Sequence, residues 1–170
     1  CGTSTHWMAF AREKLGMPFG SPNAMNIYCI DPAPRMFLPK DVFHIRKSLQ
    51  ECSPELDLFT ELLPNDVVFL DGSHRAWQNS DVTVFFLEIL PSLKPGVLIH
   101  AHDVFFPDDY PAKWGNRYYS EQYLLAAAML YSPEKFLPLF GSHYVGETPA
   151  LREQWAWLFA LPALAPRKIG

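Results

Sequence analysis

The stretch Asp66-Val-Val-Phe-Leu-Asp-Gly-Ser-His74 decides the fold, because a run of apolar residues gives way abruptly to a polar turn. Residues 67–70 are all apolar, which is typical of a strand buried on both faces, as in a parallel sheet. Asp71 follows that run directly. We therefore expect a buried strand over residues 66–71, with Asp71 and His74 at its carboxyl end.

Strands and helices alternate on both sides of this stretch. Short apolar runs that end in turn residues indicate the strands, and helical spacing of apolar residues indicates the helices. The expected strands are 26–30, 42–45, 66–71, 96–102 and 136–145. The expected helices are 3–15, 53–63, 80–90, 122–130 and 151–161. This order predicts a doubly wound α/β fold with a mostly parallel sheet, built as a single domain over residues 1–170.

Composition disfavours several classes of function. A net charge of −4 disfavours nucleic acid as a main partner, and no apolar run reaches the ~20 residues that a membrane-spanning helix needs. Three cysteines without metal-ligand spacing indicate free thiols in a reducing compartment, so we expect a cytoplasmic protein. The apolar stretch 155–165 fits either the core or the contact face of a homo-oligomer.

Polar residues stand at the ends of three expected strands, namely Asp31, Asp71 and the pair His102-Asp103. In an open α/β sheet, ligands bind outside the carboxyl ends of the strands. A single aspartate at such a place is explained equally well by turn formation, because Asp favours turns. Polar residues at several strand ends, together with His74 shortly after Asp71, favour a ligand site.

These residues resemble a known family. Asp71-Gly-Ser-His74, a helix ending in Leu93-Lys-Pro-Gly96 and a strand ending in His102-Asp103 are similar, in this order, to motifs of the class I S-adenosylmethionine-dependent methyltransferases. That family includes metal-dependent O-methyltransferases that act on sugars of natural products. The resemblance implies a methyltransferase with the Rossmann-like fold.

Three further segments agree with the family's motif order. Gly2-Thr-Ser-Thr5 is similar to the end of its glycine-rich first motif, Ile30-Asp-Pro32 to the end of its second strand, and 118–123 to a helix start after its fifth strand. The resemblance therefore covers residues 1–145. The family's first strand precedes the glycine-rich motif, so we expect that strand to be missing and the chain to be incomplete at its N-terminus.

The resemblance implies a site for S-adenosylmethionine. Gly2, Ser4 and Thr5 would lie beside the methionine portion of the cofactor, where a glycine lets the backbone approach closely. Asp31 would accept hydrogen bonds from both ribose hydroxyls, since a carboxylate accepts two bonds at once. Asp71 is a further candidate contact of the cofactor.

The resemblance also implies a general base and a metal. His74 would take the proton from the acceptor hydroxyl, and imidazole suits that task because it titrates near neutrality. The alternative for His74 is a loop histidine that caps the next helix. Asp71 and Asp103 would bind a divalent cation such as Mg²⁺. His102 stands where relatives often carry an acid. As a ligand it would shift the preference from Mg²⁺ towards Mn²⁺, Fe²⁺ or Zn²⁺, and otherwise it hydrogen-bonds a carboxylate.

The leading hypothesis is an S-adenosylmethionine-dependent O-methyltransferase that acts on a hydroxyl of a small molecule or sugar. The second is a truncated, non-catalytic domain of the same fold. The third is a metal-dependent hydrolase, which would use five residues: Asp71, His74, His100, His102 and Asp103.

The aromatic and acidic segment 105–114 would cover the acceptor as a lid, and its alternative is a surface loop held by buried aromatic residues. The candidate acceptor contacts in and after this segment are Asp108, Asp109, Tyr110, Trp114 and Arg117. His143 has no partner pattern in the sequence, and we assign it to structure.

Overall fold

The structure is a computed structural model that describes residues 2–21, 24–52 and 57–160. The chain forms two compact units, Cys1–His100 and Ala101–Gly170, and each is described by itself. The expectation of a single domain stays a prediction. None of the helices in the described residues is long and apolar enough to cross a membrane.

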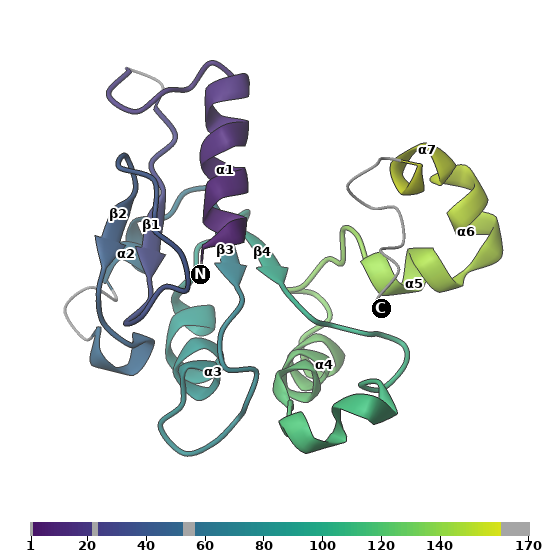
Figure 1. Ribbon diagram of the computed structural model, residues 1–170. Coiled ribbons are helices and arrows are strands. Elements are labelled where there is room, and N and C mark those ends of the chain that lie inside the picture. Colours follow the sequence, from purple (N-terminus) through teal and green to yellow (C-terminus); the bar gives the residue numbers. More distant parts are fainter. Residues whose placement is uncertain (1, 22–23, 53–56, 161–170) are drawn as a thin grey trace. The chain divides into compact units, whose positions relative to one another are not determined.

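The first unit alternates helices and strands, as the sequence predicts (Figure 1). Its helices are α1 (Thr3–Lys14), the 3₁₀ turn η1 (Leu49–Glu51), α2 (Asp57–Glu61), α3 (Asp81–Val84), the π turn η2 (Phe85–Ile89) and the 3₁₀ turn η3 (Leu90–Ser92). Its strands are β1 (Tyr28–Ile30), β2 (Phe43–Ile45), β3 (Val67–Leu70) and β4 (Leu98–Ala101), whose last residue falls in the second unit. The expected helix start at 53–55 lies outside the described residues.

The four strands form two separate two-stranded sheets, β1–β2 and β3–β4. β1 and β2 are parallel, with Tyr28 opposite Phe43 and their rings stacked 4.8 Å apart. In the second sheet the Leu98 amide donates to the Asp66 carbonyl at 2.8 Å, and the rings of Phe69 and His100 stack at 4.5 Å. Residue numbers rise in the same direction from the first contact to the second in both strands, so β3 and β4 are parallel as well. The α/β class with parallel strands is confirmed, whereas one continuous doubly wound sheet stays a prediction.

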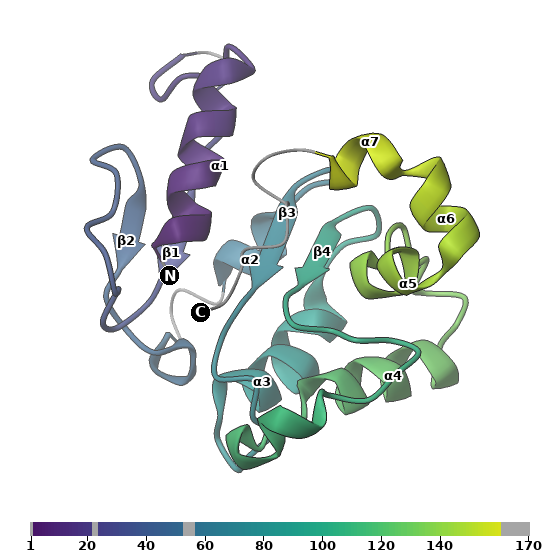
Figure 2. The same cartoon turned by 45° about the vertical axis from the view of Figure 1, so that its right-hand side comes forward.

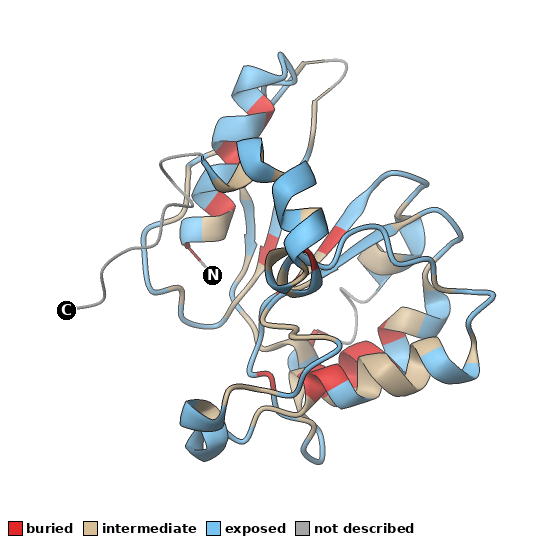
Figure 3. Cartoon of the chain, turned by 90° about the vertical axis from the view of Figure 1, so that its right-hand side faces the viewer, coloured by how far each residue is buried: buried red, intermediate tan, exposed pale blue. Residues whose placement is uncertain are grey.

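Helix α1 buries one face against the first unit. Thr5, Ala9 and Arg12 are its buried residues, and their spacing of four and three places them on one side, as the red bands in Figure 3 show. Arg12 is fully buried and forms an ion pair with the Asp41 carboxylate, and its Nη1 donates to the Asp41 carbonyl at 3.0 Å. A buried guanidinium needs such a partner, so this pair fixes α1 beside the segment that leads into β2.

The helical segment after β3 begins as the sequence predicts, at Ser80. The Ser80 hydroxyl accepts a hydrogen bond from the Thr83 amide at 3.2 Å, and the Thr83 hydroxyl accepts one from the Ser80 amide at 2.9 Å. Figure 2 shows the chain running from the end of β3 through a polar loop to α3. The helix then passes through a π turn to a 3₁₀ turn before Leu93. Pro91 explains part of this change, because it has no amide hydrogen for the regular helical bond.

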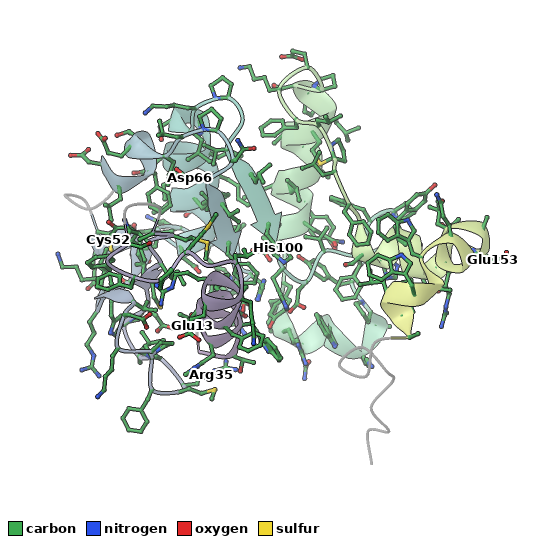
Figure 4. The ribbon with its side chains drawn as sticks, turned by 90° about the horizontal axis from the view of Figure 1, so that it is seen from above. Glu13, Arg35, Cys52, Asp66, His100 and Glu153 are labelled. Carbon is green, nitrogen blue, oxygen red and sulfur yellow. The ribbon has the colours of Figure 1, made fainter. Side chains whose placement is uncertain are left out.

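The core of the first unit is apolar and centres on this helix. Val82, Phe85 and Ile89 are at most 2% exposed, and Val68 and Leu70 of β3 are buried too. Cys29 and Cys52 are buried thiols that form no disulfide bond within the described residues, and Cys52 is labelled in Figure 4. A buried β3 and a buried helix together hold the polar loop between them in place.

In the described part of the second unit, residues 101–160, the regular elements after the last residue of β4 are helices. They are the 3₁₀ helix η4 (Ala112–Arg117), α4 (Glu121–Tyr131), α5 (Ser142–Glu147), α6 (Pro149–Gln154) and α7 (Ala156–Phe159). The single helix expected over 151–161 is two short helices that meet at Trp155, and its residue 161 lies outside the described residues.

The strand expected over residues 136–145 is wrong. Residues 136–141 are irregular, and α5 occupies the rest of that stretch. Pro138 cannot donate to a strand ladder, and the side chains of Leu137 and Leu139 are 81% and 71% exposed. The apolar run is therefore not a buried strand, although its composition is that of one.

Candidate functional site

The turn Asp71–His74 follows β3 directly, at the carboxyl end of the β3–β4 sheet. His74 adopts a left-handed backbone conformation, with φ of 60°, and is only 4% exposed. Its Nε2 lies 3.4 Å from Oδ1 of Asp71, whose side chain is one-third exposed. A non-glycine residue rarely adopts such a backbone, so the surrounding contacts must hold it there.

This pairing of imidazole and carboxylate is suited to proton transfer. An imidazole that accepts a proton becomes a cation, and a carboxylate beside it stabilises that cation and orients the ring. Asp71 can stabilise the cation from a position at the surface, because its side chain is partly exposed while His74 is buried. The structure thus joins the residue expected to be the base to one of the residues expected to bind cofactor or metal.

Asp31 follows β1, at the carboxyl end of the other sheet. Its Oδ1 accepts a hydrogen bond from the Ala33 amide at 2.8 Å, which forms a tight polar turn. The ring of His44, on β2, donates from Nε2 to the Asp31 carbonyl at 2.8 Å. These two bonds fix the backbone and the carboxylate of Asp31 at the strand end.

The start of α1 packs against the loop that follows Asp31. Gly2 has φ of 135°, and a Cβ built on it would lie 3.1 Å from Cβ of Met36. The Thr3 hydroxyl donates to the Met36 sulfur at 3.4 Å, and Nε2 of His6 donates to the Phe37 carbonyl at 2.7 Å. The first turn of α1 and the loop after β1 therefore lie together, as the expected cofactor residues require.

Thr5 and Ser4 differ in their surroundings. Thr5 is 5% exposed, and its side chain hydrogen-bonds the thiol of Cys29 on β1, whereas Ser4 is half-buried. Burial raises the pKa of the Cys29 thiol, the charge of Asp31 raises it further, and the bond with Thr5 lowers it. Thr5 therefore joins α1 to β1, next to Asp31, rather than facing solvent.

The described residues give no support to the metal site expected at Asp71, His102 and Asp103. Within residues 2–21, 24–52 and 57–160, no three His, Cys, Asp or Glu side chains gather in a geometry that would hold a metal ion. Asp71 belongs to the first unit, while His102 and Asp103 belong to the second. Nδ1 of His102 lies 3.0 Å from Oδ1 of Asp103, which is the carboxylate contact that the sequence left as the alternative to ligation.

His100 also has a partner other than a metal. It lies on β4, where Figure 4 labels it, and its ring stacks on Phe69 of β3. This contact places His100 in the sheet as a packing residue. The arrangement gives no support to the hydrolase hypothesis, which needs His100 among the ligands.

The second unit holds an aromatic pocket that the sequence indicated only in part. Its volume is about 210 Å³, and its lining residues are Asp109, Tyr110, Pro111, Ala112, Trp114, Gly115, Tyr118, Tyr119 and Tyr123. The hydroxyl of Tyr123 and the amide of Tyr110 both donate to Oδ1 of Asp109, at 2.5 and 2.7 Å. These bonds hold the pKa of Asp109 below its usual range, so this carboxylate is ionised at neutral pH.

The sequence did not predict two other contacts of the second unit. Burial raises the pKa of Tyr110 to about 12, and its hydroxyl accepts from the Gln122 amide at 3.1 Å. Nε2 of His143 lies 2.8 Å from Oδ2 of Asp108. The two residues of that pair are far apart in the chain, and no local pattern could have joined them. Arg117 stacks over Trp114 at 3.9 Å beside the pocket.

Comparison with known proteins adds one finding. A family model described as a methyltransferase domain matches residues 1–104 of the chain. The matched stretch includes Asp31, Asp71, His74 and Asp103. No curated protein and no solved structure shows a significant match to the chain.

Proposed function

We propose an O-methyltransferase that acts on a hydroxyl of a small molecule or sugar, because this chain belongs to the methyltransferase-domain family and is an S-adenosylmethionine-dependent methyltransferase. The observation that carries the proposal is the pairing of His74 with Asp71 at the end of β3. A hydroxyl is a poor nucleophile until it loses its proton, so an O-methyltransferase needs a base at this place.

The base in this proposal is His74. Its imidazole accepts the proton of the acceptor hydroxyl, and Asp71 stabilises the imidazolium that results. General base catalysis of this kind contributes ~10²- to 10⁴-fold in rate. The burial of His74 restricts water around the ring, which strengthens its electrostatic contact with Asp71.

The residues at the end of β1 fit the cofactor. S-adenosylmethionine supplies an electrophilic methyl group when it is bound. The Asp31 carboxylate is fixed through Ala33, and because each carboxylate oxygen accepts more than one bond, it retains acceptor capacity for a ribose diol. Gly2 lies so close to Met36 that a side chain there would crowd it, so a glycine suits the place where the chain enters α1 beside the loop after Asp31.

The aromatic pocket of the second unit, taken by itself, has the chemistry of a ligand site. Ring faces such as that of Trp114 suit a flat or ring-shaped molecule, and the ionised Asp109 accepts hydrogen bonds from hydroxyls. Arg117, close to the same ring, disfavours a cationic ligand. These features suit a neutral, hydroxyl-bearing ligand.

Metal assistance is the part of the proposal that the described residues support least. Asp71, His102 and Asp103 have the chemistry for Mg²⁺ or Mn²⁺, but they form no three-ligand group, and no step is derived through a metal. Methyl transfer would be measured after chelation and after addition of Mg²⁺ or Mn²⁺. Restored activity would support assistance, and activity unchanged by chelation would exclude it.

The test of the function uses the full chain and labelled S-adenosylmethionine with a panel of sugars and phenols. Transfer to a hydroxyl oxygen, located by mass spectrometry, is the expected result. His74→Ala should lower kcat at least ~10²-fold and change the cofactor Kd less than about twofold, because the base touches the acceptor rather than the cofactor. Failure of the chain to bind cofactor at all in calorimetry would favour the non-catalytic hypothesis.

A further inference from the structure

The turn that carries His74 is strained and polar, and it needs an anchor. His74 has φ of 60°, and Asn79, in the same loop, has φ of 53°. Residues other than glycine rarely keep this backbone conformation unless their surroundings fix it. The structure shows what fixes the part of the loop next to His74.

Both oxygens of Asp81 bind Ser73, the residue before His74. Oδ2 accepts from the Ser73 amide at 2.7 Å, and Oδ1 accepts from the Ser73 hydroxyl at 2.5 Å. The Ser73 hydroxyl in turn accepts from the Arg75 amide at 3.3 Å. The residues on both sides of His74 are therefore tied, through Ser73, to one carboxylate.

The same carboxylate explains Gly72. A Cβ built on Gly72 would overlap Oδ2 of Asp81 and would lie 3.2 Å from its Cγ. Real Cβ atoms do not approach a neighbour so closely. The carboxylate of Asp81 thus lies directly against the backbone of the turn, so a side chain at position 72 would have to displace it.

Asp81 has a simpler interpretation, which the contacts do not favour. An acid in the first turn of a helix stabilises it through the helix dipole, and such acids are usually solvated. Here the start of α3 is already capped by Ser80 and Thr83. The carboxylate of Asp81 instead turns back to the loop, while Val82, which is fully buried, anchors the backbone beside it.

We propose that Asp81 is a positioning residue of the methyl transfer, which holds the turn Asp71–His74 so that the His74 ring meets the acceptor and Asp71. It does not touch the reacting atoms, and it acts through Ser73. The inference rests on the proposed role of His74 as the base.

The first test compares Asp81→Ala with Asp81→Asn in the full chain. An asparagine can turn its oxygen to the Ser73 amide and its nitrogen to the Ser73 hydroxyl, so it keeps both bonds without the charge. We expect Asp81→Ala to lower kcat at least tenfold with an unchanged KM for the cofactor, and Asp81→Asn to stay within threefold of the wild type. Equal losses in the two variants would overturn the proposal, because they would show that the charge matters and not the geometry.

Ser80→Ala is the matched control. It removes the cap of α3 but leaves the bonds to Ser73 intact, so it should lower Tm and leave kcat within twofold when both are measured well below Tm. Gly72→Ala should reproduce the kcat loss of Asp81→Ala, because the added methyl group displaces the carboxylate. A kcat loss in Ser80→Ala as large as in Asp81→Ala would overturn the proposal in favour of a purely structural role.

A second readout does not depend on activity. In NMR spectra of the full chain with ¹³C-labelled histidine, the His74 ring signal can be assigned by its loss in His74→Gln. The signal should shift or broaden in Asp81→Ala and stay in place in Ser80→Ala and Asp81→Asn. An unshifted signal in Asp81→Ala would overturn the proposal. A wild-type chain without methyl transfer would overturn the proposed function instead, and the NMR signal would still decide the role of Asp81.

Discussion

Nε2 of His74 lies 3.4 Å from Oδ1 of Asp71, within the turn that follows β3. At this distance the carboxylate stabilises a protonated imidazole without a tight hydrogen bond, and a small movement of the turn would shorten the contact. Hydrogen bonds of a catalytic pair are often long before substrate binds. The interaction of the carboxylate with the imidazole therefore explains by itself why Asp71 stands next to His74, and this explanation requires no metal.

Asp71→Asn should lower kcat by about 10²-fold and leave the cofactor Kd nearly unchanged, because an amide cannot stabilise the imidazolium as a carboxylate does. Steady-state kinetics and calorimetry on the same preparation check both quantities. If excess Mg²⁺ or Mn²⁺ restores the activity of the variant, Asp71 acts as a metal ligand rather than as the partner of His74.

Asp31→Ala should weaken cofactor binding by about 10²-fold with a smaller change in kcat, because two hydrogen bonds to a charged acceptor are lost. Calorimetry with S-adenosylmethionine measures the Kd. Asp66→Ala is a matched control, since Oδ2 of Asp66 accepts from the Leu63 amide at 2.8 Å but lies at the opposite end of a strand. Equal weakening in both variants would show general destabilisation and not a ribose contact.

The sequence was informative wherever the signal is local. The consecutive apolar residues 67–70 predicted β3, and Ser80 predicted the start of α3, because burial on two faces and helix capping both leave short patterns. The prediction of a strand over residues 136–145 rested on the same kind of short apolar pattern, and it was wrong. Apolar composition alone does not distinguish a buried strand from exposed and helical segments, and the exposure of Leu137 is decided by packing.

The site was predictable only where its residues are neighbours in the chain. Asp71 and His74 share one turn, so their proximity could be foreseen. The contact of Asp81 with Ser73 depends on how α3 packs beneath β3, and the contact of His143 with Asp108 spans a whole helix and loop. Such contacts arise from tertiary packing, which leaves no spacing rule in a single sequence.

Gly96→Ala should lower the free energy of unfolding by about 2 kcal/mol or more, through left-handed strain and overlap combined. Gly96 has φ of 89°, and a Cβ there would lie 2.8 Å from Cβ of Pro64. Gly20 is the control, because its φ of 83° is similar and no atom of the described residues lies within 4 Å of its Cβ position. Urea unfolding of both variants measures the difference, and equal losses would show that Pro64 moves away freely.

The stability of the chain should fall with rising pH above about pH 8.5, the pKa of a thiol in an unfolded chain. Burial raises the pKa of Cys29 in the folded state, so below about pH 8.5 the thiol is protonated in both states and the stability is complete. As the pH rises towards the folded pKa, only the unfolded chain loses the proton, and the free energy of unfolding decreases by at most about 1.4 kcal/mol per pH unit. Urea unfolding is measured from pH 7 to about 9.0, where an unfolded tyrosine with its pKa of about 10 is ionised to less than about one-tenth, so Tyr110 contributes little to the slope. Cys29→Ala should remove part of this slope, whatever its effect on stability at pH 7; identical slopes in the variant and the wild type would show that the Cys29 thiol ionises as freely in the folded chain as in the unfolded one.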